Sequence, residues 1–191
     1  MIENFLNYVE VLLLSFIVNV VPAFVPPTWM VLSIYHIDHP SLNTPIIVLL
    51  GVVGSVAGRL VMFYYSRILG KYLPSKYSEN LKSFKGYVEE RKRGLFLGAF
   101  IFSLGPLPTN FLFIACGIAR TEILPVLGGF AIARTISYAL VIYASLSIFS
   151  ALSPFGGPYF KEIVNILSII AGIGVVFVDW KKLRPEKIEY Q

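Results

Sequence analysis

Two long apolar stretches of this chain are each interrupted by a cluster of prolines, and this feature restricts its fold more than any other. The first stretch covers residues 5–35 and the second covers residues 95–119. The interruptions are Pro22, Pro26 and Pro27 in the first, and Gly105, Pro106 and Pro108 in the second. Proline inside a helix removes a backbone hydrogen bond and clashes with the preceding turn. Each stretch is therefore predicted to form two short helices joined at its prolines.

The remaining apolar stretches, residues 46–70, 122–150 and 163–180, are not broken in this way. A helix needs about 20 apolar residues to cross a hydrocarbon core of about 30 Å, so each is predicted to be a full transmembrane helix. Apolar residues make up 56% of the 191 positions and charged residues only 14%, against about 25% charged in soluble domains. The chain is therefore predicted to be an all-α polytopic membrane protein, folded as a single integral membrane domain over residues 1–191.

The charges are distributed unevenly along the chain. Eleven of the 16 basic residues fall in residues 71–94 and 181–191. Cytoplasmic segments of membrane proteins carry such an excess of Lys and Arg, so both segments, a linker and a C-terminal tail, are predicted to be cytoplasmic. Nucleic-acid binding is not expected, because it calls for aromatic side chains interleaved with the basic ones on a folded soluble face.

The two broken stretches are predicted to be re-entrant hairpins, which enter and leave the membrane on the same side. In the second stretch, two half-helices of about ten residues reach only to mid-membrane at 1.5 Å per residue. With the N-terminus outside, this arrangement brings both basic segments to the cytoplasmic face. Prolines are also tolerated in kinked spanning helices. If the second broken stretch crosses fully, the basic segments lie on opposite faces; if the first crosses, the N-terminus moves inside.

The chain also contains a weak internal repeat. Residues 26–29 (PPTW) correspond to residues 107–110 (LPTN), and residues 56–59 (VAGR) correspond to residues 131–134 (AIAR). Repeat 1 spans about residues 5–70 and repeat 2 about residues 95–150, with opposite orientations in the membrane. Inverted repeats of this kind recur in transporters. Chance similarity is the alternative, because Pro-Thr pairs are common.

Two arginines, Arg59 and Arg134, lie near the centres of the predicted spanning helices. A charged side chain at that depth costs at least about 2.5–3.5 kcal/mol on insertion scales, so it usually faces a cavity or a partner. The arginine fork fits phosphate oxygens, and helix N-termini favour anions. The predicted substrate-binding residues are Arg59, Arg134, Thr28, Thr109, Asn110 and Tyr138. The alternative is that the arginines brace the backbone carbonyls of the hairpins.

The proline-broken hairpins, the glycine-rich span with Arg59, the helix end YYSRILG at residues 64–70 and the Cys116-Gly117 pair together resemble the DedA/VTT-domain superfamily (SNARE-associated Golgi proteins) over roughly residues 18–150. The resemblance implies two facing re-entrant hairpins and a role in moving anionic lipids, such as phospholipids or polyprenyl phosphates, across the bilayer. The positions near Ser103 and Thr109, where the family carries hairpin arginines, are uncharged in this chain.

The sequence thus predicts a lipid-translocating or scrambling membrane transporter. A small-solute or ion exporter and a non-transporting membrane scaffold are the alternatives. No catalytic residues, cofactor or metal site are predicted, and the chain is not expected to be an enzyme. Membrane lipids are the expected partner, and the sequence leaves open whether copies of the chain form a homo-oligomer.

Overall fold

The computed structural model describes residues 2–22, 26–72, 92–104, 109–152 and 166. In this part of the chain all regular structure is helical, which confirms the all-α prediction. The helices are α1 (Ile2–Val20), α2 (Thr28–Asp38), α3 (Thr44–Leu69), the 3-10 helix η1 (Gly70–Tyr72), α5 (Lys92–Leu104), α6 (Asn110–Ile118) and α7 (Ile123–Leu152). Pro22, Pro26 and Pro27 fall between α1 and α2, as predicted, whereas Gly105, Pro106 and Pro108 lie outside the described residues.

Local sequence accounts for where these helices begin and end. Helix α1 ends at Val20, two residues before Pro22, and α2 begins directly after Pro27, whose φ of −58° is compatible with a helix start. Asn43 precedes α3, and its side chain accepts a hydrogen bond from the backbone nitrogen of Ile46. Asparagine is among the most favourable N-cap residues, since it satisfies one of the unpaired amides of the first turn.

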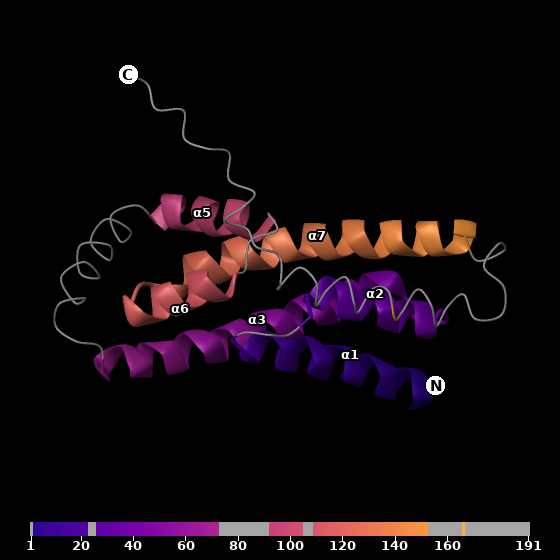
Figure 1. Cartoon of the computed structure of the whole chain (residues 1–191), viewed down its shortest axis with the longest axis horizontal. Helices are drawn as coiled ribbons and strands as arrows, with labels where there is room; N and C mark the ends of the chain where they lie inside the picture. The colour runs from indigo at the N-terminus through magenta and orange to yellow at the C-terminus, as the bar shows by residue number, and fades with distance from the viewer. Residues whose placement is uncertain (1, 23–25, 73–91, 105–108, 153–165, 167–191) are drawn as a thin grey trace, which may run out of the picture.

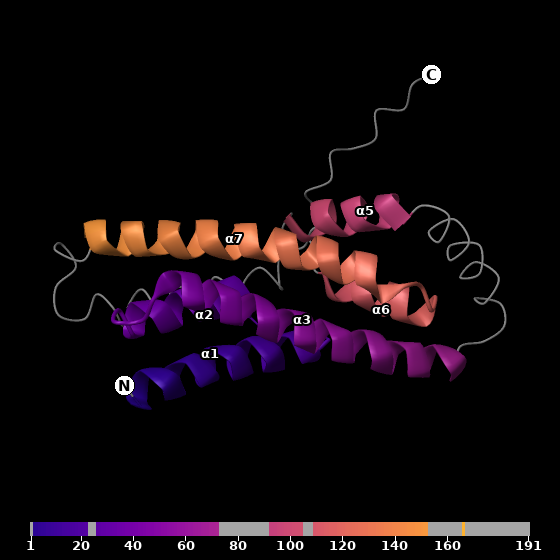
Figure 2. The same ribbon diagram turned by 180° about the vertical axis from the view of Figure 1, so that it is seen from behind.

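The long helices α3 and α7 run along the length of the molecule, and each shorter helix lies along only part of it (Figures 1 and 2). Helices α1 and α2 occupy one half of the long axis, and α5 and α6 occupy the other half. The chain reverses direction between α1 and α2, and again between α5 and α6, near the middle of the molecule. The broken stretches therefore enter the structure from opposite ends.

Each half of the chain packs one of its short helices against the long helix of the other half. Helix α1 packs on α3 and α5 packs on α7, while α2 also contacts α7 and α6 also contacts α3. One apolar cluster joins α1, α2 and α3 to Tyr138 and Ile142 of α7. A second cluster joins Met62 and Phe63 of α3 to α5, α6 and α7. Each core thus contains residues from both halves, so neither half buries its apolar surface alone.

Equivalent glycines bring the paired helices into close contact in both halves. A Cβ atom added to Gly54 of α3 would lie 2.5 Å from the carbonyl oxygen of Leu12 in α1. One added to Gly129 of α7 would collide in the same way with the carbonyl oxygen of Phe96 in α5. The two glycines are 75 positions apart, the same separation as Arg59 and Arg134. Both pairs of helices therefore use the same small-residue contact, which lets backbones approach closely.

Two helices in the described part of the chain, Thr44–Tyr72 and Ile123–Ala151, are long and apolar enough to cross a membrane. They correspond to two of the three predicted spans, and the third, residues 163–180, lies outside the described residues. Shorter apolar helices are found at Asn4–Val20 and Arg93–Leu104, in the two broken stretches. The segments 71–94 and 181–191, predicted to be cytoplasmic, fall largely or wholly outside the described residues.

Candidate functional site

Arg59 lies on α3 in the interior of the protein, with 6% of its surface exposed. Its Nη1 atom donates to the thioether sulfur of Met62 at 3.3 Å. Its Cζ atom is 5.9 Å from the ring centroids of both Phe113 and Phe130. The Nε atom is buried and has no hydrogen-bond partner. Because a thioether is only a weak acceptor, this guanidinium group keeps donors that the surrounding side chains do not satisfy.

Arg134 lies on α7, partly buried, and faces the same aromatic ring. Its Cζ atom is 5.3 Å from the centroid of Phe130 and 5.9 Å from that of Tyr138. Its Nη2 atom donates to the hydroxyl of Thr109 at 3.2 Å. Thr109 is the N-cap residue of α6, but its side chain makes no capping bond to that helix. The hydroxyl therefore serves as an acceptor for the arginine.

The two guanidinium groups thus share Phe130, and their positive charges repel each other. Among the described residues, the charged and titratable groups that act on Arg59 are Arg134, Tyr138 and Tyr65, and none of these is a carboxylate. Cation–π contacts are worth about 0.5–2 kcal/mol each. The two cation–π contacts of Arg59 together offset about the 2.5–3.5 kcal/mol that burying one arginine costs on insertion scales. They do not offset the repulsion between Arg59 and Arg134. An anion placed between the arginines would relieve it.

A chain of buried polar side chains connects the first hairpin to this site. The Asn19 Nδ2 atom lies 2.8 Å from Ser15 O, 2.8 Å from Thr28 Oγ1 and 2.9 Å from Ser55 Oγ. The Ser55 hydroxyl is in turn 2.9 Å from the hydroxyl of Tyr138. An amide nitrogen has two hydrogens, so two of the three Asn19 contacts can be hydrogen bonds at one time. Thr28 therefore reaches the ring beside Arg134 through Asn19 and Ser55.

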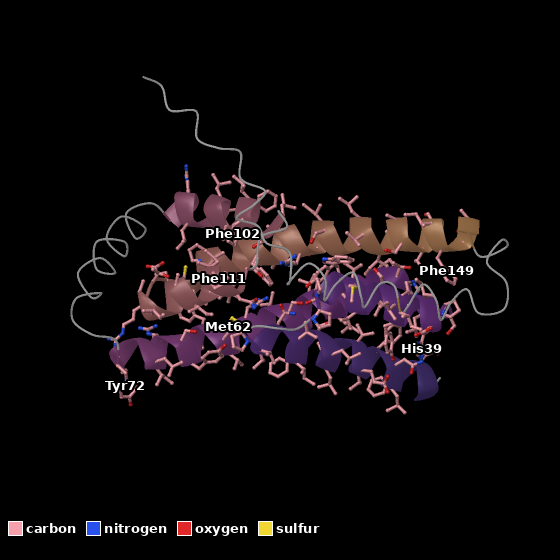
Figure 3. All side chains as sticks on the ribbon, viewed as in Figure 1. His39, Met62, Tyr72, Phe102, Phe111 and Phe149 are labelled. Atoms are coloured by element: carbon pink, nitrogen blue, oxygen red, sulfur yellow. The ribbon has the colours of Figure 1, made fainter. Side chains whose placement is uncertain are left out.

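The two hairpins also contact each other directly. The Asn110 side chain, at the start of α6, donates to the carbonyl of Pro22, just after α1. The Tyr65 hydroxyl on α3 donates to the carbonyl of Val20 at 3.4 Å. These bonds satisfy backbone carbonyls left unpaired at the end of α1. In Figure 3, Met62, the partner of Arg59, lies between Tyr72 at one end of the long axis and His39 and Phe149 at the other. The candidate site therefore lies away from both ends of the molecule.

The structure brings together four of the six predicted substrate-binding residues, namely Arg59, Arg134, Thr109 and Tyr138. Thr28 joins them through the polar chain, whereas Asn110 binds the first hairpin and neither arginine. Sequence reasoning missed Asn19 and Phe130. A signal existed for Asn19, which is a polar residue three positions before Pro22 in an otherwise apolar run. No comparable signal marks Phe130, since Phe is common in apolar helices.

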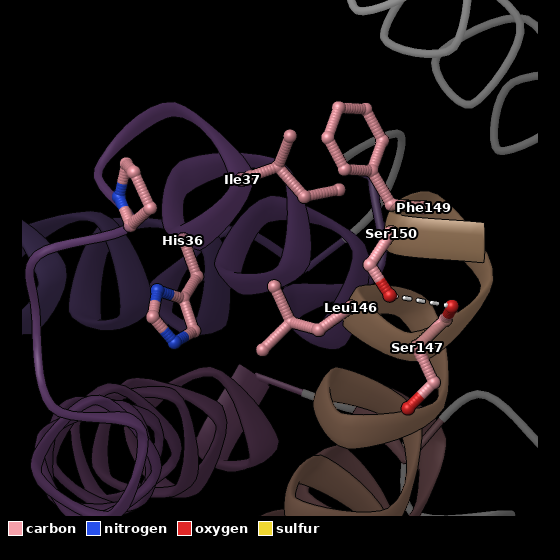
Figure 4. Close-up of a pocket in the computed structure, with 7 residues that line it drawn as sticks. His36, Ile37, Leu146, Ser147, Phe149 and Ser150 are labelled. Atoms are coloured by element: carbon pink, nitrogen blue, oxygen red, sulfur yellow. Dashed lines mark hydrogen bonds between the residues drawn. The ribbon is translucent and has the colours of Figure 1, made fainter. Parts of the chain in front are cut away.

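A pocket of about 420 Å³ lies away from the arginines, between the C-terminal ends of α2 and α7 (Figure 4). The side chains that line it are His36, Ile37, Pro40, Leu146, Ser147, Phe149 and Ser150. The His36 ring is hydrogen-bonded to Thr44, and the two serine hydroxyls donate to carbonyls of their own helix. The polar groups of this pocket are thus already engaged, in contrast to those of Arg59.

No protein-family model, curated protein or solved structure matches this chain. The resemblance to the DedA/VTT-domain superfamily therefore stays a prediction from the sequence. What the arrangement can do follows from its chemistry: two adjacent cations, a hydroxyl and a tyrosine can bind an anion with several oxygen atoms.

Proposed function

We propose that this chain is an integral membrane transporter of the DedA/VTT type that translocates or scrambles an anionic lipid, a phospholipid or a polyprenyl phosphate. The headgroup would bind at Arg59 and Arg134, between the two hairpins. The observation that carries the proposal is Arg59, a buried cation with an unpartnered Nε atom and a second arginine beside it. A phosphate group offers the acceptor oxygens that this pair lacks.

A membrane location is supported by the outer surface of the helices. Two helices have the length and composition of membrane spans. Large apolar side chains are exposed along them and along α1, among them Leu13, Ile17, Leu49, Leu140 and Ile148. Exposed apolar surface of this extent is unfavourable in water and is what a lipid-facing surface requires. The proposed orientation places residues 71–94 and the C-terminus in the cytoplasm.

Two re-entrant hairpins in an inverted repeat would explain how a headgroup reaches the middle of the bilayer. This part of the proposal is supported by α1–α2 and α5–α6 entering from opposite ends, and by the equivalent contacts of Gly54 and Gly129. The contact between Asn110 and Pro22 joins the two breaks. Irregular backbone at membrane depth is tolerated where it lines a cavity or is buried in protein, so the breaks are suited to a polar pathway.

Passive translocation fits this site better than coupled export of a small solute. A coupled exporter usually uses a membrane carboxylate that gains and loses a proton. Among the described residues, Asp38 ends α2, Glu122 precedes α7 and Glu10 of α1 accepts a hydrogen bond from Tyr35 at 2.7 Å, and the groups acting on Arg59 include no carboxylate. The positive site is thus suited to binding an anion without an obligatory proton.

The test is lipid translocation in liposomes, measured with a fluorescent phosphatidylglycerol analogue, for Arg59→Lys, Arg134→Lys and the two Gln variants. A lysine cannot reproduce the bidentate fork, so we expect both Lys variants to slow translocation at least about tenfold, as expected for losing a charge-assisted hydrogen bond. Arg67→Lys, at the exposed end of α3, is the matched control and should be unaffected.

Thermal stability of the same variants separates transport from bracing. If the arginines only support the hairpins, melting temperature and translocation will fall together, because buried acceptors lose their donors. If they bind the headgroup, the Lys variants will lose translocation at an unchanged melting temperature. Normal translocation in all four variants would end the proposal.

A further inference from the structure

The two hairpins are held by donors of different charge. Thr28 and Thr109 each follow a proline, begin or cap the second helix of their hairpin, and are 81 positions apart. The hydroxyl of Thr28 accepts from the neutral amide of Asn19, whereas the hydroxyl of Thr109 accepts from the charged guanidinium of Arg134. Equivalent positions are therefore secured in unequal ways.

The first hairpin is held by the side-chain amide of Asn19, which is uncharged and therefore does not attract an anion. Asn19 contacts α1 at Ser15, α2 at Thr28 and α3 at Ser55, all in the buried interior. The glycine contacts align α1 with α5 so that Leu12 corresponds to Phe96, and on this register Asn19 corresponds to Ser103. The Ser103 hydroxyl is buried and has no partner. In the described part of the second hairpin, a serine without a partner thus stands where the first has Asn19, and α6 is tied instead by Asn110 to Pro22 and by Thr109 to Arg134.

A phosphate can replace the Thr109 hydroxyl as the hydrogen-bond acceptor of Arg134. An anionic oxygen is a stronger acceptor for a guanidinium than a neutral hydroxyl is, and Arg134 lies beside the unpartnered Arg59. We propose that an anionic phosphate ligand displaces Thr109 from Arg134, so that ligand binding loosens α6 while Asn19 keeps α2 in place. This inference rests on the proposed function, because it assigns to the same site the step that follows headgroup binding.

Cys116 reports on α6 without any mutation. It is the only cysteine of the chain and is fully buried on α6, in the cluster with Phe63 and Phe113. Its rate of reaction with N-ethylmaleimide would be measured in nanodiscs of phosphatidylcholine, of phosphatidylglycerol, and of phosphatidylcholine with added inorganic phosphate. We expect phosphatidylglycerol to speed the reaction about two- to tenfold, the population change that follows the loss of one hydrogen bond.

Three variants make this measurement specific. Thr109→Val should react fast in phosphatidylcholine and gain nothing from phosphatidylglycerol. The exposed hydroxyl of Thr135 donates to the carbonyl of Ala131 in its own helix, so Thr135→Val should behave like the wild type. Ser33→Cys in a Cys116→Ala background places a buried thiol on α2, and its reaction should not depend on the lipid. An equal response of this α2 thiol would overturn the proposed asymmetry.

Headgroup binding is measured separately, as the difference in melting temperature between the two lipids for the wild type and Arg59→Gln. If phosphatidylglycerol stabilises the wild type but leaves Cys116 unchanged, displacement is overturned and the proposed function stands. If it stabilises neither protein, the proposed function fails. In that case the proposed displacement of Thr109 fails as well. Equal rates of Cys116 modification in Thr109→Val and the wild type, both in phosphatidylcholine, would show independently that the bond between Arg134 and Thr109 does not hold α6. A full response to inorganic phosphate alone assigns the site to a free anion instead of a lipid.

Discussion

Gly54 on α3 and Gly129 on α7 lie where two helix backbones nearly touch. A methyl group at either position would meet a backbone carbonyl oxygen, which cannot move aside as a flexible side chain can. We expect Gly54→Ala and Gly129→Ala each to destabilise the protein by about 1–3 kcal/mol, the usual cost of overpacking, partly offset by the helix propensity of alanine, up to about 1 kcal/mol.

Gly98 on α5 is the matched control for these variants, because no atom lies within 4 Å of a Cβ added there. Gly98→Ala should be neutral or slightly stabilising. Thermal unfolding of the three variants in one detergent measures the difference. Equal melting temperatures for all three would show that the close contacts at Gly54 and Gly129 are absent in the folded protein.

The sequence marked Arg59 and Arg134 because charge is rare in apolar helices and therefore stands out. It did not mark Phe130, which lies beside both arginines, because one phenylalanine among 15 carries no individual signal. It also placed Asn110 with the arginines, whereas its side chain binds Pro22. Residue type predicts the kind of bond, but the choice of partner depends on how the helices pack.

At the scale of helices, the prolines predicted the breaks but not the lengths of the pieces. Helix α1 has 19 residues, whereas α5 has 13 and α6 has 9. Helix α5 also begins at Lys92, inside the predicted basic linker of residues 71–94. Basic residues are good helix formers, so charge alone does not end a helix. The described part of α5 packs against α7, a contact that the sequence does not display.

The contact between the two breaks gives a prediction at the same scale. The Asn110 side chain reaches the carbonyl of Pro22, so the backbones of these residues are near neighbours. In a Cys116→Ala background, the double variant Pro22→Cys with Asn110→Cys should be linked efficiently by a short bismaleimide. Mass spectrometry of the intact chain measures the yield.

Leu14 provides the control for this cross-link, because it lies on α1 with an exposed side chain. The pair Leu14→Cys with Asn110→Cys should give little product with the same reagent. Equal yields for the two pairs would contradict the contact between the hairpins, and with it the position of the candidate site away from both ends of the molecule.

At the scale of the whole molecule, the exchange of α2 and α6 between the two long helices means that neither half of the described chain buries its apolar surface alone. The cluster around Tyr138 and the cluster around Phe63 each need both halves of the chain. Sequence comparison of the two halves suggested their relationship from short motifs such as residues 56–59 and 131–134. It could not suggest the exchange, because which helix covers which face is a property of the assembled fold.

The orientation of the molecule gives the last prediction. The proposed re-entrant hairpins would place residues 76 and 187 on the cytoplasmic face and residue 40 on the opposite face, because an excess of Lys and Arg marks cytoplasmic segments. Single variants Lys76→Cys, Lys187→Cys and Pro40→Cys, each in a Cys116→Ala background, would be labelled with an impermeant maleimide in intact and in opened cells. We expect Pro40→Cys to react in intact cells and the other two only after opening. Labelling of positions 76 and 187 from opposite faces would mean that the second broken stretch crosses the membrane fully, since it lies between the two basic segments and its crossing puts them on opposite faces. If only the first broken stretch crosses, positions 76 and 187 stay inside and the N-terminus moves inside with them, so a fourth variant, Asn4→Cys, distinguishes that case from two hairpins.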